Sequence, residues 1–361
     1  MKNFADQFPV LSQYIYANTA ACGLLSDGLM EWRQEHDLDY LIGGSVMQMK
    51  SLSLLGETKK TIGKFFNCKP DNVALVPNFS LGLNQLLEGL DIKHKVLLLE
   101  SDYPSVNWPF ESRGFDVSYV KIDENLEMNI QNKVKVDNIS VLALSLVQWV
   151  NGVKINLNFL QQLKNEYPNL IIIADGTQFC GTSQFDFESS GIDLLGASGY
   201  KWLLAGYGNG FWMCKEGVKD YFSLKGSGFG SVNGNLNAKD KIPFMKRLEP
   251  GHLDTLNFGS LNFSLGFLSR IGMDSIETRV KELTEYAKTK FTELGLLEPY
   301  VVRRNDHGPI FNIKGNDALF QHLTEKNVVC SQRGGGIRLS FHFYNSEKHI
   351  DDIVKSLVTR T

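Results

Sequence analysis

The sequence predicts an α/β fold with a mostly parallel sheet between two layers of helices, followed by a smaller α+β domain. Short apolar runs alternate with helical segments from about Val73 to Cys214, which is typical of parallel strands joined by helices. The chain has 361 residues, 43% of them hydrophobic, and can therefore bury a sizeable core. After Gly259 the pattern changes to longer helical segments.

Seven runs predict the strands of the sheet, at residues 73–76, 96–100, 117–122, 140–145, 170–174, 194–197 and 211–214. Residues 215–246 are rich in Gly, Ser and Asn and predict a long loop bordering the functional site. The remainder predicts a helix through Arg270, a longer helix at 274–294, strands near Val301 and at 337–343, and a final helix from Ser346. We expect a large domain at residues 15–250 and a small domain made of residues 1–14 and 251–361.

Composition argues against several classes of protein. Thirty-seven basic and forty acidic residues leave a formal net charge of -3 without a long basic run, so no nucleic-acid partner is expected. No apolar stretch resembles a signal peptide or could span a membrane, so we expect neither secretion nor membrane insertion. The five cysteines are scattered and odd in number, which indicates a cytoplasmic protein without a zinc or other metal site: Cys22, Cys68, Cys180, Cys214 and Cys330.

Asp175 and Lys201 carry the strongest chemical signal. Asp175 follows the apolar run 171–174, and Lys201 comes 26 residues later in the sequence Ser-Gly-Tyr-Lys. Ligands of such sheets bind beyond the carboxyl ends of the strands. Pyridoxal 5′-phosphate (PLP) requires an amine to form an imine with its aldehyde and a carboxylate to keep its ring nitrogen protonated. The pattern predicts these catalytic roles, although Lys201 alone would be a surface charge and Asp175 alone a turn or helix cap.

The phosphate of PLP requires hydroxyls and free amides at the start of a helix. Phe79 and Ser80 follow a predicted strand and open a helix, so their amides and the Ser80 hydroxyl could bind an anion. A plain helix cap explains the same residues equally well. Ser198 and the Tyr200 hydroxyl are close to Lys201 in sequence and could reach the same phosphate.

Three further residues match the remaining parts of the cofactor and its substrate. Gln178, three residues after Asp175, is expected to donate to the ring oxygen of PLP. Tyr103 lies just beyond a strand end and offers an aromatic plane for the ring face. Arg338 interrupts an apolar strand, and its guanidinium suits a substrate carboxylate, with a structural carboxylate as the alternative partner.

These residues together resemble the class V aminotransferase family, fold-type I PLP enzymes that include cysteine desulfurases, kynureninase and several transaminases. The most specific segments are 174–178, 198–203 and 206–211, and the similarity runs from Phe8 to Ser346. The resemblance implies that Lys201 forms the aldimine, Asp175 pairs with the ring nitrogen, Gln178 meets the ring oxygen and Arg338 binds the substrate carboxylate. It also implies a homodimer with active sites at the subunit interface, and substrate contacts from Asn18 and Trp149.

Several departures from the family pattern bear on the reaction. Only three glycines and Ile337 separate Arg333 from Arg338, where desulfurases carry a cysteine on a loop. Cys330 looks like a strand residue, whereas a persulfide-forming thiol must be mobile, so desulfurase activity is disfavoured. Tyr103 and Tyr200 replace family histidines, as in kynureninase. Trp149 replaces an asparagine near the substrate. Gly251-His252 replaces the Gly-Thr that reaches the partner's phosphate, with Thr255 or Asn257 as substitutes.

The sequence therefore predicts a PLP-dependent aminotransferase for a small amino acid and keto acid pair, with Lys201 as both anchor and base. A kynureninase-like β-lyase or hydrolase is the alternative, and cysteine desulfurase is a weaker one. Glycines at 206, 208 and 210 suggest a nucleotide-dependent oxidoreductase, but the dinucleotide fingerprint is incomplete. A non-catalytic PLP-binding protein also stays open because of Trp149. The identity of the amino donor and acceptor does not follow from the sequence.

Overall fold

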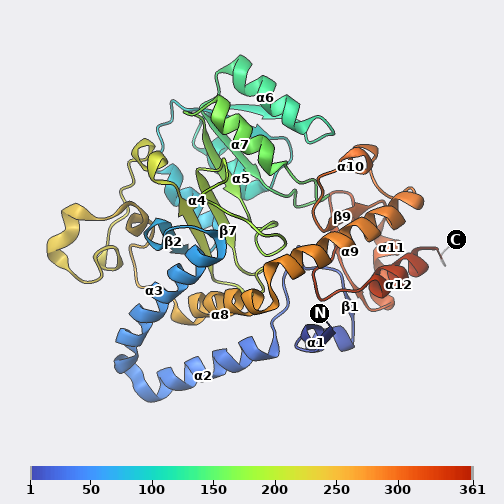
Figure 1. The fold of residues 1–361 in the computed structure, drawn as a ribbon, viewed down its shortest axis with the longest axis horizontal. Coiled ribbons are helices and arrows are strands. Elements are labelled where there is room, and N and C mark those ends of the chain that lie inside the picture. Colours follow the sequence, from blue (N-terminus) through green and yellow to red (C-terminus); the bar gives the residue numbers. More distant parts are fainter. Residues whose placement is uncertain (1, 359–361) are drawn as a thin grey trace.

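A seven-stranded mixed sheet lies at the centre of the molecule (Figure 1). The computed structural model describes residues 2–358. The strand order is β2-β8-β7-β6-β5-β3-β4, in which β3 to β7 run parallel and β8 is antiparallel to both neighbours. The strands are β2 (Val73–Val76), β3 (Lys95–Leu99), β4 (Asp116–Val120), β5 (Val141–Ser145), β6 (Ile171–Asp175), β7 (Leu194–Ser198) and β8 (Gly210–Cys214). All seven predicted strands are confirmed, with no end shifted by more than two residues.

Alternate residues of the central strands face opposite sides of the sheet, and both sides are buried. Leu142 and Leu144 of β5 join one apolar cluster, while Val141 and Ala143 join another. This explains why the strands read as continuous apolar runs without polar alternation. On one side lie α4 (Phe79–Leu87) and α5 (Pro104–Ser112). The other side is covered by α3 (Met47–Phe66), α6 (Leu126–Asp137), α7 (Leu157–Glu166) and α8 (Thr255–Ile271).

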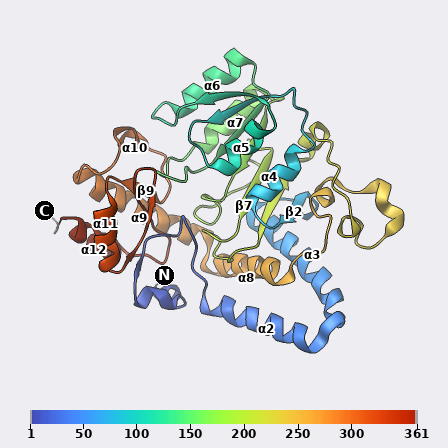
Figure 2. The same cartoon turned by 180° about the vertical axis from the view of Figure 1, so that it is seen from behind.

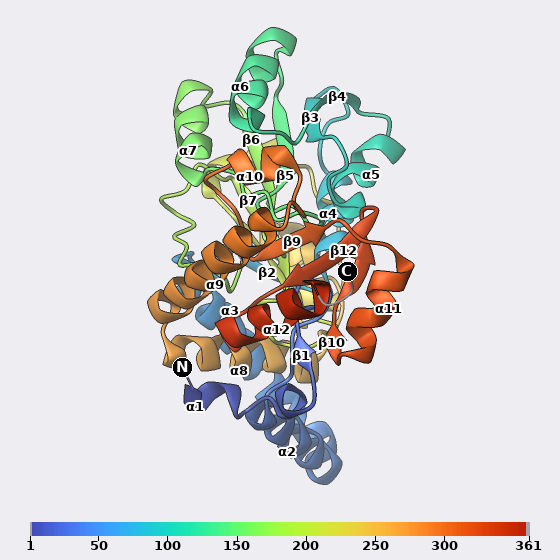
Figure 3. The same ribbon diagram turned by 90° about the vertical axis from the view of Figure 1, so that its right-hand side faces the viewer.

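A three-stranded antiparallel sheet of order β11-β12-β9 lies beside the large sheet, with α9, α11 and α12 around it (Figure 3). Its elements are α9 (Met273–Glu293), β9 (Ile310–Ile313), α11 (Asp317–Glu325), β11 (Ser331–Arg333), β12 (Gly336–Ser340) and α12 (Glu347–Val358). One predicted strand is wrong: Val301 lies in the short helix α10 (Pro299–Arg303). Pro299 occupies the first turn of that helix, where its fixed φ and missing N–H are tolerated.

The N-terminal segment joins the C-terminal part of the chain. It contains α1 (Lys2–Ala5), the 3-10 turn Pro9–Ser12 and β1 (Ile15–Tyr16), and β1 pairs in parallel with β10 (Val328–Val329). Next, α2 (Asp27–Gly43) and α3 form a hairpin that projects from the body and packs against α8 (Figure 2). The predicted division into domains at 15–250 and at 1–14 with 251–361 stays a prediction.

Residues 215–248 contain neither α-helix nor β-strand, as predicted for a long loop. They form four 3-10 turns at Glu216–Tyr221, Phe229–Val232, Leu236–Lys241 and Phe244–Leu248, and they project beyond β2 (Figure 1, yellow). The buried Glu249 anchors the end of this segment, because it accepts from Leu75 N and pairs with Lys59 and Lys246. Within residues 2–358, no helix is both long and apolar enough to cross a bilayer.

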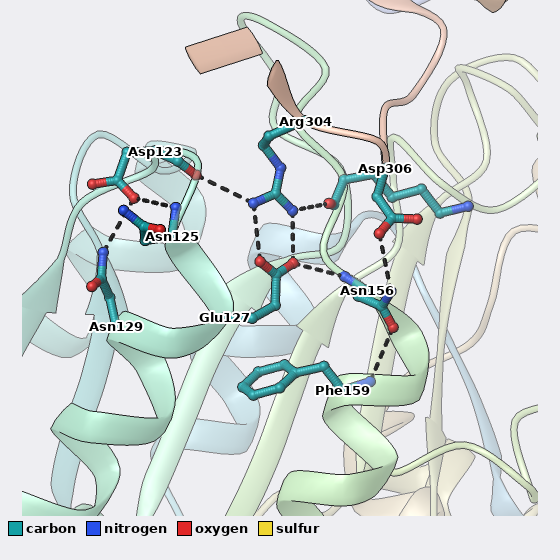
Figure 4. A network of polar contacts seen from close by, with 9 residues as sticks. Asp123, Asn125, Glu127, Asn129, Asn156, Phe159, Arg304 and Asp306 are labelled. Atoms are coloured by element: carbon teal, nitrogen blue, oxygen red, sulfur yellow. Dashed lines mark hydrogen bonds and ion pairs between the residues drawn. The ribbon is translucent and has the colours of Figure 1, made fainter. Parts of the chain in front are cut away.

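An ion pair between the buried Arg304 and the partly buried Glu127 fastens the segment after α10 to α6 (Figure 4). The Arg304 guanidinium donates to both Glu127 oxygens, at 3.0 and 2.6 Å, and to the carbonyl of Lys154 at 2.9 Å. Burial opposes ionisation of Glu127, but Arg304 outweighs it and holds the pKa of this carboxyl below its usual value. Asn156 adds a bridge by donating to Asp306. The network joins α6, the start of α7 and the C-terminal part of the chain.

We predict that Glu127→Gln destabilises the protein, because it leaves the guanidinium of Arg304 buried without a counter-charge. Removing one partner of a buried pair costs roughly 3 kcal/mol. Urea unfolding followed by circular dichroism measures the loss. Glu124→Gln is the matched control, since its partner Arg303 is exposed and exposed pairs contribute little. Equal midpoints for the two variants would contradict the structural role of Arg304.

Candidate active site

Lys201 lies in the turn after β7 and is 5% exposed. Its Nζ is 5.4 Å from the ring centroids of both Tyr103 and Tyr200. Among residues 2–358, no side chain or carbonyl makes a hydrogen bond or ion pair with this amine. The side chain therefore places a buried amine near the faces of two aromatic rings.

Asp175, the last residue of β6, is the carboxylate whose charge acts on the amine of Lys201. Its Oδ1 accepts from Thr177 N at 2.8 Å, and the residue is 6% exposed. Burial raises the pKa of Asp175, while Lys201 opposes the rise. Burial lowers the pKa of Lys201, Asp175 opposes that shift, and Arg338 adds to it. The structure thus brings the two predicted catalytic residues together at adjacent strand ends, as β6 and β7 pair in parallel.

Asp102 is a buried acid that sequence reasoning missed. It accepts from Tyr103 N at 2.6 Å and from Ser145 N at 2.8 Å, which ties the turn after β3 to the end of β5. Burial raises its pKa, and its charge contributes to the raised pKa of Asp175. Its position in the sequence, beyond a strand end and one residue before Tyr103, could have identified Asp102 as a candidate site residue. Asp102 fixes the backbone that carries Tyr103.

The start of α4 meets the end of β7, as predicted for the phosphate-binding residues. The N–H of Phe79 donates to Ser198 Oγ at 2.9 Å, and Ser80 Oγ donates to Ser105 Oγ at 2.7 Å. Asn78 caps the helix by accepting from Leu81 N. The amides at a helix start carry a partial positive charge that attracts anions. Phe79, Ser80 and Ser198 therefore form one polar patch, and their role toward a phosphate stays a prediction.

Gln178 is held by two groups on opposite sides. Its Nε2 donates to Ala20 O at 3.0 Å, and its Oε1 accepts from Trp202 Nε1 at 2.7 Å. One amide hydrogen is left over, so the predicted bond to the ring oxygen of PLP is compatible with this position and stays a prediction. Thr177, the preceding residue, accepts from Ser198 N and links the ends of β6 and β7.

Arg338 of β12 has no carboxylate partner among the residues described, and it is 3% exposed. One terminal nitrogen donates to Trp149 O at 2.8 Å, while its buried Nε lacks any partner within residues 2–358. Burial lowers the pKa of Arg338 to about 10, and the like charge of Arg333 adds to this. Tyr200 and Tyr103 act in the opposite direction, which places Arg338 beside the same rings as Lys201. The alternative expectation was that a carboxylate of the protein pairs with Arg338. No such pair occurs within residues 2–358.

The predicted substrate contacts Asn18 and Trp149 lie near this guanidinium. Trp149 supplies the carbonyl just described, and its ring stands edge-on to Tyr103 at 5.6 Å. Asn18 accepts from Ser331 Oγ at 2.7 Å and is bridged to Ser340 of β12. Their contacts with a substrate stay predictions.

The N-terminal segment covers the lysine turn and ties it to β12. Gly23 N donates to Tyr200 O at 2.8 Å, and any side chain at Gly23 would clash with the carbonyl oxygen of Lys201. At the other end, Ser340 N donates to Ala17 O and Ser340 Oγ accepts from Ala20 N. This cover shields the amine from water and requires glycine at position 23.

Thr255 and Asn257, predicted substitutes for the partner-reaching residue, are engaged within the chain. Thr255 Oγ1 lies 3.0 Å from His36 Nε2, and Asn257 bonds to Asp254. His252 is exposed and stacks on Phe229 at 5.4 Å. Which of them reaches a partner subunit stays a prediction.

A family model described as aminotransferase class-V matches residues 42–353. The chain belongs to this family. An uncharacterized aminotransferase of Bacillus subtilis is 22% identical over 373 residues, covering 100% of this chain and 98% of the relative. The apo cysteine desulfurase of Thermococcus onnurineus has a TM-score of 0.88 at 19% identity, over 99% of this chain and 97% of that one. The cystine C–S lyase C-DES, solved with its product cysteine persulfide, has a TM-score of 0.87 at 18% identity, over 97% and 99%. These two structures show the α/β fold-type I architecture.

The class V family consists of PLP-dependent enzymes, and the described residues fit this cofactor. A buried amine with no bonding partner is available for the aldehyde, and a buried carboxylate at the neighbouring strand end is available for the ring nitrogen. At the start of α4 the Phe79 amide donates to Ser198 Oγ, and a phosphate bound there would take the place of that contact. The relatives include an aminotransferase and a cysteine desulfurase at similarly low identity, so the comparisons do not assign either reaction to this chain.

We predict that the apoprotein reacts with PLP at lower pH than an ordinary lysine would. The neutral amine is the nucleophile, and burial lowers the pKa of Lys201 to about 8, so the rate should rise with pH and level off above about pH 8. Arg338→Gln removes a cation that depresses this pKa, so its profile should shift to higher pH. Stopped-flow measurement of the visible cofactor band checks both, with Arg279→Gln as a remote control. An unshifted Arg338→Gln profile would contradict the coupling.

Proposed function

We propose that this protein is a PLP-dependent aminotransferase that processes a small amino acid and keto acid pair. The observation that carries the proposal is that Lys201 and Asp175 are buried together at adjacent strand ends. Beside them lies the guanidinium of Arg338, which lacks a carboxylate partner among the residues described. When bound, PLP supplies an aldehyde and an electron-withdrawing ring. Arg338 then orients the substrate by its carboxylate, through bidentate bonds that lysine could not make.

Lys201 has two tasks in this proposal. It would hold the cofactor through Nζ, and its neutral amine would take the proton from the substrate α-carbon. Its lowered pKa suits both tasks, because each requires the neutral amine. Asp175 holds a proton on the ring nitrogen, and its burial strengthens that interaction by excluding water. Tyr103 would offer its ring to the ring face of the cofactor, and Trp149 packs edge-on against Tyr103.

The start of α4, with Phe79, Ser80 and Ser198, is the proposed phosphate site, joined by the Tyr200 hydroxyl. Gln178 donates its remaining amide hydrogen to the ring oxygen. Asn18 is proposed to contact the substrate from the N-terminal cover, since it is already bonded to Ser331 next to the Arg338 strand. These assignments follow the family pattern together with the contacts found here.

Cysteine desulfurase activity is disfavoured by the state of Cys330. This thiol is 8% exposed and lies between β10 and β11 rather than on a free loop, and burial raises its pKa to about 11. A sulfur-accepting thiol must be exposed and easily ionised. A kynureninase-like β-lyase or hydrolase stays the second candidate, because Tyr103 and Tyr200 flank the lysine where many relatives have histidine.

A homodimer is also proposed, and the surface supports it. Large apolar side chains are exposed together on the turn between α2 and α3, with exposed fractions from 75 to 80% for Leu41, Ile42, Val46 and Met49. Patches of this kind mark interfaces. The neighbouring helix α2 has five acidic residues and one basic, whereas the projecting segment 223–247 has five basic and one acidic. Two copies could therefore place the acidic helix of one against the basic segment of the other.

We predict that the purified protein forms keto acid from an amino acid only when a keto acid acceptor is present. Without an acceptor, one equivalent at most is formed, because the amino group stays on the cofactor. Quantifying keto acid and amino acid products by mass spectrometry checks this. Lys201→Ala should lose both activity and the visible cofactor band. Continuous ammonia release without acceptor would favour the β-lyase instead.

We predict that Ile42→Glu with Val46→Glu converts the dimer to monomers, because charges would enter the apolar contact. The dissociation constant should rise about 100-fold or more. Light scattering after size-exclusion chromatography measures the mass across protein concentrations. Met128→Glu with Val136→Glu is the matched control, since these α6 side chains are 54 and 74% exposed. A wild-type monomer, or equal dissociation of both variants, would contradict this interface.

A further inference from the structure

Arg333 is a second guanidinium near the site, on the same face of the small sheet as Arg338. In the β11–β12 hairpin, Ser331 pairs with Arg338 and Arg333 pairs with Gly336. Residues 331 and 333 point to one side of their strand, because side chains alternate. Arg333 and Arg338 are therefore diagonal neighbours on one face, a relation in which long side chains reach each other. The effect of Arg333 on the pKa of Arg338 agrees with this closeness.

The hairpin tip is fixed close to the substrate end of the site. Asn312 of β9 donates to Arg333 O at 2.6 Å, and Asn312 pairs with Arg338 across the sheet. Gly334 has a φ of 57° and leaves no room for a side chain against Val150, the neighbour of Trp149. Since Trp149 O accepts from Arg338, the hairpin tip and both guanidinium groups lie close to residues 149–150.

The charge of Arg333 is not neutralised within the residues described. Its guanidinium is exposed and donates only to the carbonyl of the adjacent Gln332, and no carboxylate lies within ion-pair distance. Arg338 also lacks a carboxylate. Two guanidinium groups without carboxylate partners lie on one face, and one of them, Arg338, acts on the amine of Lys201, so this face carries an excess of positive charge. A ligand with two carboxylates would neutralise both groups.

We propose that the substrate is a dicarboxylic amino acid, such as aspartate or glutamate, with its α-carboxylate on Arg338 and its side-chain carboxylate on Arg333. The proposal rests on the function proposed above and narrows its substrate class. Arg333 then acts as a specificity residue, because monocarboxylic amino acids use Arg338 alone. The exposed position of Arg333 leaves its side chain free to turn toward the ligand, over a tip whose Gly334 and Gly335 both have positive φ.

The test compares aspartate and glutamate with alanine for wild-type protein and Arg333→Gln. We expect kcat/KM for the better dicarboxylic substrate to fall about 10- to 100-fold in the variant, and kcat/KM for alanine to change less than about threefold. Arg303→Gln is the matched control, since it removes a surface arginine on a different element whose partner is Glu124. A parallel loss with all three substrates, or no loss with any, would overturn the proposal.

A binding measurement separates this proposal from the proposed function. Titration calorimetry with succinate and butyrate requires no turnover and can be repeated on Lys201→Ala. We expect succinate to bind more tightly than butyrate, and Arg333→Gln to abolish the difference in both backgrounds. Equal binding of the two acids by wild-type protein would reject the dicarboxylate assignment, even if the cofactor band and amino transfer are normal. Absence of the band with intact succinate preference would reject only the function.

Discussion

The burial of Lys201 beside Asp175 is the constraint on which the site depends. Removing the two groups from water disfavours both charges, while their mutual attraction and the hydrogen bonds of Thr177 to Asp175 work against this. Proteins rarely bury such groups without a counterpart. The surrounding structure serves to hold them there: parallel pairing of β6 and β7 fixes their separation, Asp102 fixes the strand end that carries Tyr103, and the N-terminal cover excludes solvent.

Much of the architecture could be predicted from local patterns. Continuous apolar runs indicated doubly covered strands, and all seven were found because such runs have few alternatives in a chain of this composition. Val301 was misassigned because a five-residue helix has too few turns to show a period. The positions of Asp175 and Lys201 followed from strand ends, which always share one edge of a parallel sheet.

What the sequence could not give were contacts between distant segments. Gln178 is bonded to Ala20, 158 residues away, and Arg338 to Trp149, 189 residues away. Neither hydrogen bond produces a recognisable pattern in the sequence around its residues. Asp102 escaped notice because an acid in a surface turn and an acid buried under a turn look alike until its two backbone donors are known. The absence of a carboxylate beside Arg338 is likewise a property of the folded chain.

The N-terminal cover has a consequence for how the protein is made. Its β1 pairs with β10, and Ala17 bonds to Ser340, so these residues are secured by residues synthesised much later. Chains emerge from the ribosome N-terminus first and fold as units become available. The nascent large sheet can therefore assemble while the amine is still in contact with water, and the N-terminal cover is secured only after β10 and β12 have been made. Completion of the catalytic pocket therefore waits for the small sheet.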